Sequence, residues 1–187
     1  MIGPAKFCAV TLCLLSFAAG ARAEARSEPL TPAQQFEQIR AWEGRWQVEE
    51  TPALKIVFES TARGSAMVER WETQSGLHSM TLYHMDGDVL MATHYCPQGN
   101  QPRLESRGTS QGEIRFEFRD VTDLSAGESH THALWFTQEA DGTLKRSEVY
   151  RGEGGLQPAS HYTLSKLSAD IGALQSPPPP SSGPTAR

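Results

Sequence analysis

About ten short runs of strand-forming residues follow one another along the chain, each separated from the next by turn residues. Connections this short suit antiparallel neighbours, because parallel strands need long crossovers. A sheet of about ten strands tends to close or split rather than lie flat, and closure removes its exposed edges. The sequence therefore predicts a mainly β fold with a single antiparallel barrel. The predicted strands cover residues 46–50, 54–61, 66–73, 77–85, 89–96, 103–107, 113–120, 130–137, 144–150 and 160–167.

One helix is predicted before these strands. Thr31 can cap it, proline follows at the first helical position, and Gln34 lies three residues after the cap. Gly44 is a typical helix stop. We expect one short helix over Pro32–Trp42, which leads directly into the first strand.

The segment 113–119 has the clearest two-residue period. Ile114, Phe116 and Phe118 alternate with charged side chains. A sheet with one dry face and one wet face produces this alternation. We expect all three apolar side chains to point into the barrel.

Asp86-Gly87 is a strong hairpin signal between the strands 77–85 and 89–96. A two-residue loop at this dipeptide would place Met85 opposite Asp88, whereas a three-residue loop would exchange the faces. Both faces are fairly apolar, so the sequence does not decide which one is interior. The two-residue loop gathers Ser79, Thr81, Tyr83, Leu90, Ala92, His94 and Cys96 on one face.

The first 23 residues have the features of a signal peptide. Lys6 precedes the apolar run Phe7–Ala19, which is too short to span a bilayer comfortably, and Ala21-Arg22-Ala23 is a small-x-small cleavage site. We expect cleavage after Ala23 and export to the periplasm or out of the cell. No membrane span is expected after cleavage.

The other end of the chain predicts a tail. Residues 169–187 include the proline-rich run SPPPPSSGPTAR, which is typical of an extended segment with no capacity to form a core. The barrel domain is therefore expected over residues 24–168. This part of the chain keeps a single cysteine, Cys96, so we expect no internal disulfide and a fold that depends on core packing.

The composition narrows the classes of partner. The chain has 187 residues and a formal net charge of −5, without a basic run. Such a chain is a poor nucleic-acid binder. The sequence identifies neither a cofactor nor an oligomeric state.

Two segments resemble known barrel proteins. Gly44-Arg45-Trp46 follows the predicted helix and resembles the G-x-W signature of lipocalins and their calycin relatives. The segment Thr81–Glu105 resembles a bacterial β-barrel family with a domain of unknown function, in which T-H-Y-C leads through a short loop to G-N-Q-P-R. The later H-x-H strand with His130 and His132 is also similar. The resemblance implies a lipocalin-like barrel over most of residues 40–167 and brings no known substrate.

Polar residues in these motifs form the candidate binding site. His130 and His132 share a strand face with apolar neighbours, so we expect both to project into the barrel. A buried imidazole needs a partner or a ligand. Arg103 could contact an anionic ligand at the barrel mouth, or it could tie down its own loop. The candidate ligand-binding residues are His84, His94, Tyr95, Arg103, His130 and His132.

Three functions fit this pattern. The favoured one is an exported lipocalin-like barrel that binds a small, mainly apolar ligand in a cavity lined by histidine and tyrosine. The alternatives are a barrel that binds haem or a metal through histidines such as His94, or a structural envelope protein with a filled core. Gly108–Gly112 matches the G-x-S-x-G motif of hydrolases, but an alternating strand follows it. We therefore interpret that segment as a hairpin turn, and no other motif identifies a reaction.

Overall fold

The computed structural model describes residues 28–108 and 112–168 of the chain and shows a mainly β fold in them. The strands begin and end within about two residues of the predicted runs, as expected for pattern-based boundaries. The elements are α1 (Pro32–Ala41), β1 (Gly44–Val48), β2 (Lys55–Thr61), the 3₁₀ turn η1 (Ala62–Gly64), β3 (Ala66–Thr73), β4 (Gly76–Asp86), β5 (Val89–Tyr95), β6 (Gln101–Ser106), β7 (Glu113–Thr122), β8 (His130–Gln138), β9 (Leu144–Gly152), β10 (Gly155–Leu156) and β11 (Ser160–Lys166).

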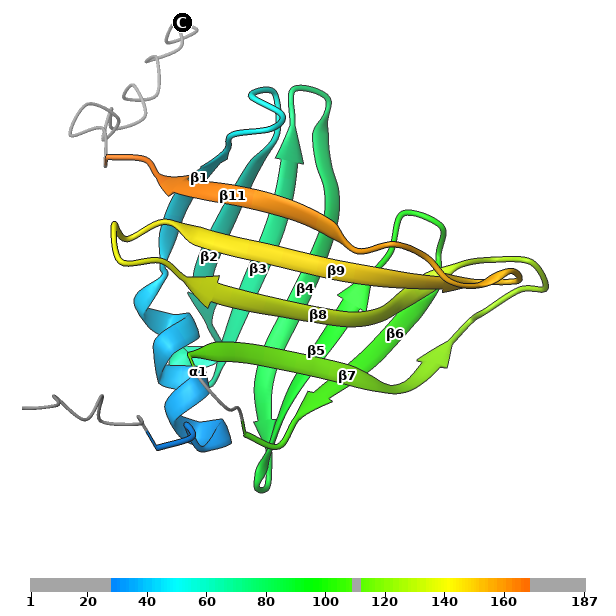
Figure 1. Cartoon of the computed structure of the whole chain (residues 1–187), viewed down its shortest axis with the longest axis horizontal. Coiled ribbons are helices and arrows are strands. Elements are labelled where there is room, and N and C mark those ends of the chain that lie inside the picture. The colour runs from blue at the N-terminus through cyan, green and yellow to red at the C-terminus, as the bar shows by residue number, and fades with distance from the viewer. Residues whose placement is uncertain (1–27, 109–111, 169–187) are drawn as a thin grey trace, which may run out of the picture.

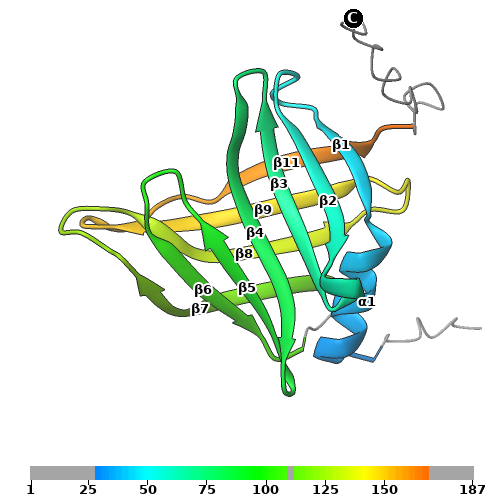
Figure 2. The same cartoon turned by 180° about the vertical axis from the view of Figure 1, so that it is seen from behind.

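Ten strands close into an antiparallel barrel, which confirms the predicted fold class. The strands β1 to β8 pair in chain order, β8 pairs with β9, β9 with β11, and β11 with β1. The sequence did not predict β10, a two-residue strand that pairs with the last two residues of β9. Figures 1 and 2 show β1 to β6 as one layer, with β7, β8, β9 and β11 crossing it as the other.

The helix α1 lies across one end of the barrel (Figure 1). Its start has the predicted capping box, in which Thr31 Oγ1 accepts a hydrogen bond from Gln34 N while Gln34 Oε1 accepts one from Thr31 N. Ser106 of β6 donates a 2.8 Å hydrogen bond to the buried Gln35. Phe36 and Ile39 of α1 belong to the buried apolar core of the barrel. Trp42, after the last turn of α1, packs 4.9 Å from Phe136 between ring centres.

The β4–β5 hairpin turns one residue later than predicted. Asp86 pairs with Val89, so the two-residue loop is Gly87-Asp88. Gly87 has a positive φ of 60° and Asp88 does not, which is the pattern of a type II′ turn with glycine in the first loop position. The shift by one residue on each strand keeps the faces of the predicted two-residue loop. The face with Ser79, Thr81, Tyr83, Leu90, Ala92 and His94 is the buried one.

Two of the three inward residues predicted on β7 lie in the core, and the third, Phe118, is only half-buried. Ile114 and Phe116 are buried in the core, whereas Phe118 is half-buried and lies outside it. The pairing of β7 with β8 ends at Glu117, and the pairing of β6 with β7 shifts register beside Phe118. The extra residue of this β-bulge is Arg119, so Phe118 still lies opposite the fully buried Leu104 of β6.

Several predictions concern residues outside the described part of the chain. The signal peptide at residues 1–23 and the tail at 169–187 lie there, as do residues 109–111 of the G-x-S-x-G segment. That segment connects the antiparallel neighbours β6 and β7. Among the described residues, none of the helices has the length and apolarity needed to cross a bilayer.

Candidate functional site

A layer of buried polar side chains crosses the barrel interior, next to the apolar core. Glu69 of β3 accepts hydrogen bonds from Trp71 Nε1 at 2.6 Å, from Arg146 Nε at 2.6 Å and from the Tyr83 hydroxyl. Arg146 of β9 also donates to Glu148 Oε2 at 2.8 Å. All five residues are buried, and Glu69, Tyr83 and Arg146 have no exposed surface. The layer is therefore a connected network rather than a set of separate polar side chains.

The network holds opposite charges on buried side chains. Burial opposes the charge of Arg146, but the carboxylates of Glu69 and Glu148 raise its pKa above the ordinary value. Burial and the Glu69 charge raise the pKa of Tyr83 well above its ordinary value, so this side chain remains a hydrogen-bond donor. The Arg146 guanidinium also lies over the Trp71 ring, 4.7 Å from its centre. These contacts hold the network side chains in place, and the network forms the floor of a cavity.

A cavity of about 190 Å³ lies above this floor, at the end of the barrel opposite α1. Five strands contribute to its wall: β3, β4, β5, β9 and β11. Inward-facing residues of these strands alternate with outward ones, which is why one cavity collects side chains that are far apart in the sequence. Its lining residues are Trp71, His78, Ser79, His94, Pro97, Glu148, Tyr150, Ser160 and Tyr162.

His94 is the buried imidazole of this wall. Its exposed fraction is 3%, and Nδ1 lies 2.9 Å from Thr81 Oγ1. Its Nε2 is buried and has no hydrogen-bond partner among the described residues. Burial, followed by the charge of Arg146, lowers the pKa of His94 to about 4. The ring is therefore neutral at physiological pH, and one of its nitrogens is left without a hydrogen bond among the described residues.

Two tyrosines complete the polar part of the wall. Burial, and after it the Glu148 carboxylate, raise the pKa of Tyr150 to about 12. The same two causes raise the pKa of Tyr162. Tyr162 meets Trp71 edge to face, with ring centres 4.9 Å apart. The cavity thus combines aromatic surface with hydroxyl, imidazole and carboxylate groups.

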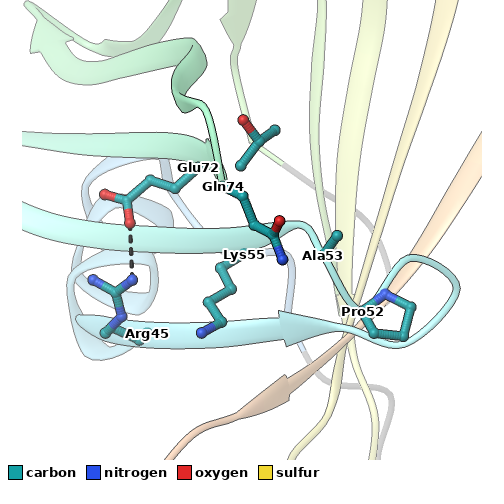
Figure 3. A pocket seen from close by; sticks show the side chains of 7 residues that line it. Arg45, Pro52, Ala53, Lys55, Glu72 and Gln74 are labelled. Atoms are coloured by element: carbon teal, nitrogen blue, oxygen red, sulfur yellow. Dashed lines mark hydrogen bonds and ion pairs between the residues drawn. The ribbon is translucent and has the colours of Figure 1, made fainter.

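Other hollows lie outside the barrel interior. One of about 200 Å³ is formed on the outer wall by Arg45, Lys55 and Glu72 with neighbouring loop residues, and Arg45 donates to Glu72 within it at 2.9 Å (Figure 3). Another, of about 320 Å³, lies between the start of α1 and the β4–β5 turn. Both are shaped by surface groups and have no buried unpartnered polar atom in their lining.

The structure does not bring the six sequence-predicted residues together. Of these, only His94 lines the cavity. His84 lies on the opposite face of its strand, with Nδ1 3.2 Å from the Met85 carbonyl oxygen, and Tyr95 is 40% exposed. Arg103 forms a two-bond ion pair with Asp120, with Nε and Nη2 at 2.6 and 2.5 Å from the carboxylate oxygens. Of the two roles considered for Arg103, this geometry favours the structural one.

His130 and His132 lie at the start of β8 and pack on Phe118 instead of lining the cavity. Their ring centres lie 4.8 and 5.3 Å from that of Phe118. The β8–β9 register shifts between Thr131 and Ala133, which leaves His132 without a paired residue on β9. Both nitrogens of His130 and Nδ1 of His132 are buried without a partner among the described residues.

Most of the cavity wall was not predicted from the sequence, in particular Trp71, Glu148, Tyr150 and Tyr162. One signal could have found part of it. Glu69 alternates with the apolar Met67 and Trp71 on β3, so a charged residue shares the inward face. A charge at such a position requires an opposite charge elsewhere in the barrel.

The metal-binding alternative would need three ligands close together. Among residues 28–108 and 112–168, no three His, Cys, Asp or Glu side chains form a group that could hold a metal ion. His94 therefore does not join His130 and His132 in such a group. Comparison with known proteins finds no matching family model and no matching curated sequence.

Proposed function

We propose that the protein is an exported, lipocalin-like binding protein that holds a small molecule in the cavity beside His94. The observation that carries this proposal is the His94 ring, which lines the cavity and whose buried Nε2 has no partner among the described residues. Leaving a buried imidazole nitrogen unpaired costs about 1–3 kcal/mol, so a hydrogen-bonding ligand is the simplest source of compensation.

The cavity suits a molecule with an apolar body and few polar groups. Trp71, Tyr150 and Tyr162 supply aromatic surface, and His94 and Glu148 supply fixed hydrogen-bonding positions. Its volume of about 190 Å³ is below the roughly 300–1,000 Å³ of pockets for drug-sized ligands. The expected ligand is therefore smaller than a typical drug molecule.

The test is to purify the protein from its native compartment and identify released small molecules by mass spectrometry. Ser79→Trp places a large ring inside the cavity, so this variant should lose the molecule that wild type carries. His130→Phe/His132→Phe is the matched control, because neither residue lines the cavity, and it should keep the molecule.

Three results would contradict the proposal. They are a wild-type protein without a bound molecule, a Ser79→Trp variant that retains it, and a double-histidine variant that loses it while remaining folded. A Soret band or stoichiometric metal in the same sample would favour the haem or metal alternative.

A further inference from the structure

The charged groups in the cavity wall are unevenly distributed. Glu148 is the one carboxylate that lines the cavity, and no lysine or arginine occurs among its described lining residues. His94 contributes no positive charge at neutral pH, because burial and Arg146 lower its pKa to about 4. His78 lies at the exposed edge of the wall. A ligand in this cavity therefore meets negative charge at close range.

The residues beneath the wall do not reverse this sign. The buried network contains two carboxylates, Glu69 and Glu148, and one guanidinium, Arg146. The formal charge of the three groups is therefore negative by one. Arg146 has no exposed surface and does not line the cavity. Its Nε and Nη1 bond to Glu69 and Glu148, and its Nη2 is buried without a partner among the described residues. An anionic ligand would find no cation to contact and would lie beside a carboxylate.

The aromatic residues suit a positive charge as well as an apolar body. Tyr150 and Tyr162 flank Glu148 in the wall, and burial with the Glu148 charge raises the pKa of both. Their ring faces attract cations through the negative charge of the π system. Arg146 already lies over Trp71 in this way, at 4.7 Å, which shows the same contact within the protein.

We infer that the ligand of this cavity is a small protonated organic amine, an inference that rests on the binding function proposed above. Its ammonium group donates to the Glu148 carboxylate, of which Oε2 already accepts from Arg146 at 2.8 Å. A second N–H donates to His94 Nε2, with the ring proton on Nδ1 directed to Thr81 Oγ1 at 2.9 Å. The organic body of the amine packs against the tyrosine rings.

The experiment compares three probes that share a phenyl ring and differ in charge: 2-phenylethylamine, 2-phenylethanol and phenylacetate. Binding to the full-length processed protein is measured by titration calorimetry at neutral pH. The amine should bind at least about tenfold more tightly than the alcohol, which corresponds to one hydrogen-bonded charge in a shielded site. Phenylacetate should bind most weakly of the three.

Two variants identify the group responsible. Glu148→Gln keeps an oxygen for Arg146 and removes the charge, so the affinities for amine and alcohol should come within about twofold of each other. Glu72→Gln is the matched control, because Glu72 is also paired with arginines but lies on the outer wall. This control should keep the preference for the amine. The wild-type comparison stands by itself if Glu148→Gln does not fold.

The outcomes separate this inference from the proposed function. Equal affinity for amine and alcohol, or tightest binding of phenylacetate, overturns the inference and leaves a binding protein for another class of ligand. Failure of all three probes also overturns it, while the molecule released from native protein decides the proposed function. A preference for the amine that survives Glu148→Gln overturns the assigned contact.

Discussion

Arg146 of β9 donates a 2.6 Å hydrogen bond from Nε to Glu69 of β3 across the barrel interior, although 77 residues separate them in the chain. Neither side chain has exposed surface. The strands β9 and β3 are not neighbours in the sheet, so this contact joins walls that backbone hydrogen bonds do not connect directly. The same ion pair therefore holds two opposite walls of the barrel together and forms part of the floor of the proposed site.

Replacing Arg146 with methionine should destabilise the protein by about 3–5 kcal/mol, because two buried carboxylates lose their counter-charge. Urea denaturation measures this as a lowered midpoint with an unchanged slope. Arg146→Lys should recover only part of the loss, since an ammonium lacks the planar fork that reaches both carboxylates. Arg103→Met removes an exposed pair with Asp120 and should leave the midpoint unchanged. Equal midpoints for wild type and Arg146→Met would contradict this account.

The strand order was predictable because it depends on local signals. Each strand shows a two-residue period or a β-branched and aromatic run, and turn residues mark most boundaries. The capping box at Thr31 depends equally on neighbours in the chain. Closure of the barrel followed from strand number rather than from any single residue.

The cavity was not predictable in the same way, because its wall depends on register across five strands. His94 and Tyr162 come together only through the closed sheet. The histidines of β8 were expected inside the barrel because period two was extended through residues 130–136. The register shift between Thr131 and Ala133 interrupts that period, and no residue type in the sequence marks it.

Phe116 and Phe118 should differ strongly when each is replaced by alanine. Phe116 has no exposed surface, so Phe116→Ala should lower the free energy of unfolding by about 3–5 kcal/mol. Phe118 is half-buried against two imidazole rings. Phe118→Ala therefore exposes less buried apolar surface and should lower the free energy of unfolding by less. Calorimetric melting of both variants provides the comparison. An equal loss would place Phe118 in the core after all.

Export remains a prediction, and the N-terminal residue of the mature protein tests it. The small-x-small sequence Ala21-Arg22-Ala23 should direct cleavage so that Glu24 becomes the first residue. Intact-mass measurement of protein from the cell exterior or periplasm checks this directly. Replacing Ala23 with a bulky residue such as phenylalanine should block processing. A cytoplasmic species that retains Met1 would contradict the prediction.

His94 should make the protein less stable in mild acid. Its folded-state pKa of about 4 lies below the ordinary 6.5, so between these values the unfolded chain binds the proton more readily. Stability is therefore complete above pH 6.5 and falls as the pH drops toward 4. Between pH 7 and pH 4.5 this one group should account for a loss of about 2–3 kcal/mol. His94→Asn can still bond to Thr81 and does not titrate, so its stability should fall less over the same interval. Unfolding free energies of both proteins at the two pH values give this difference, and parallel decreases would show that His94 is not the responsible group.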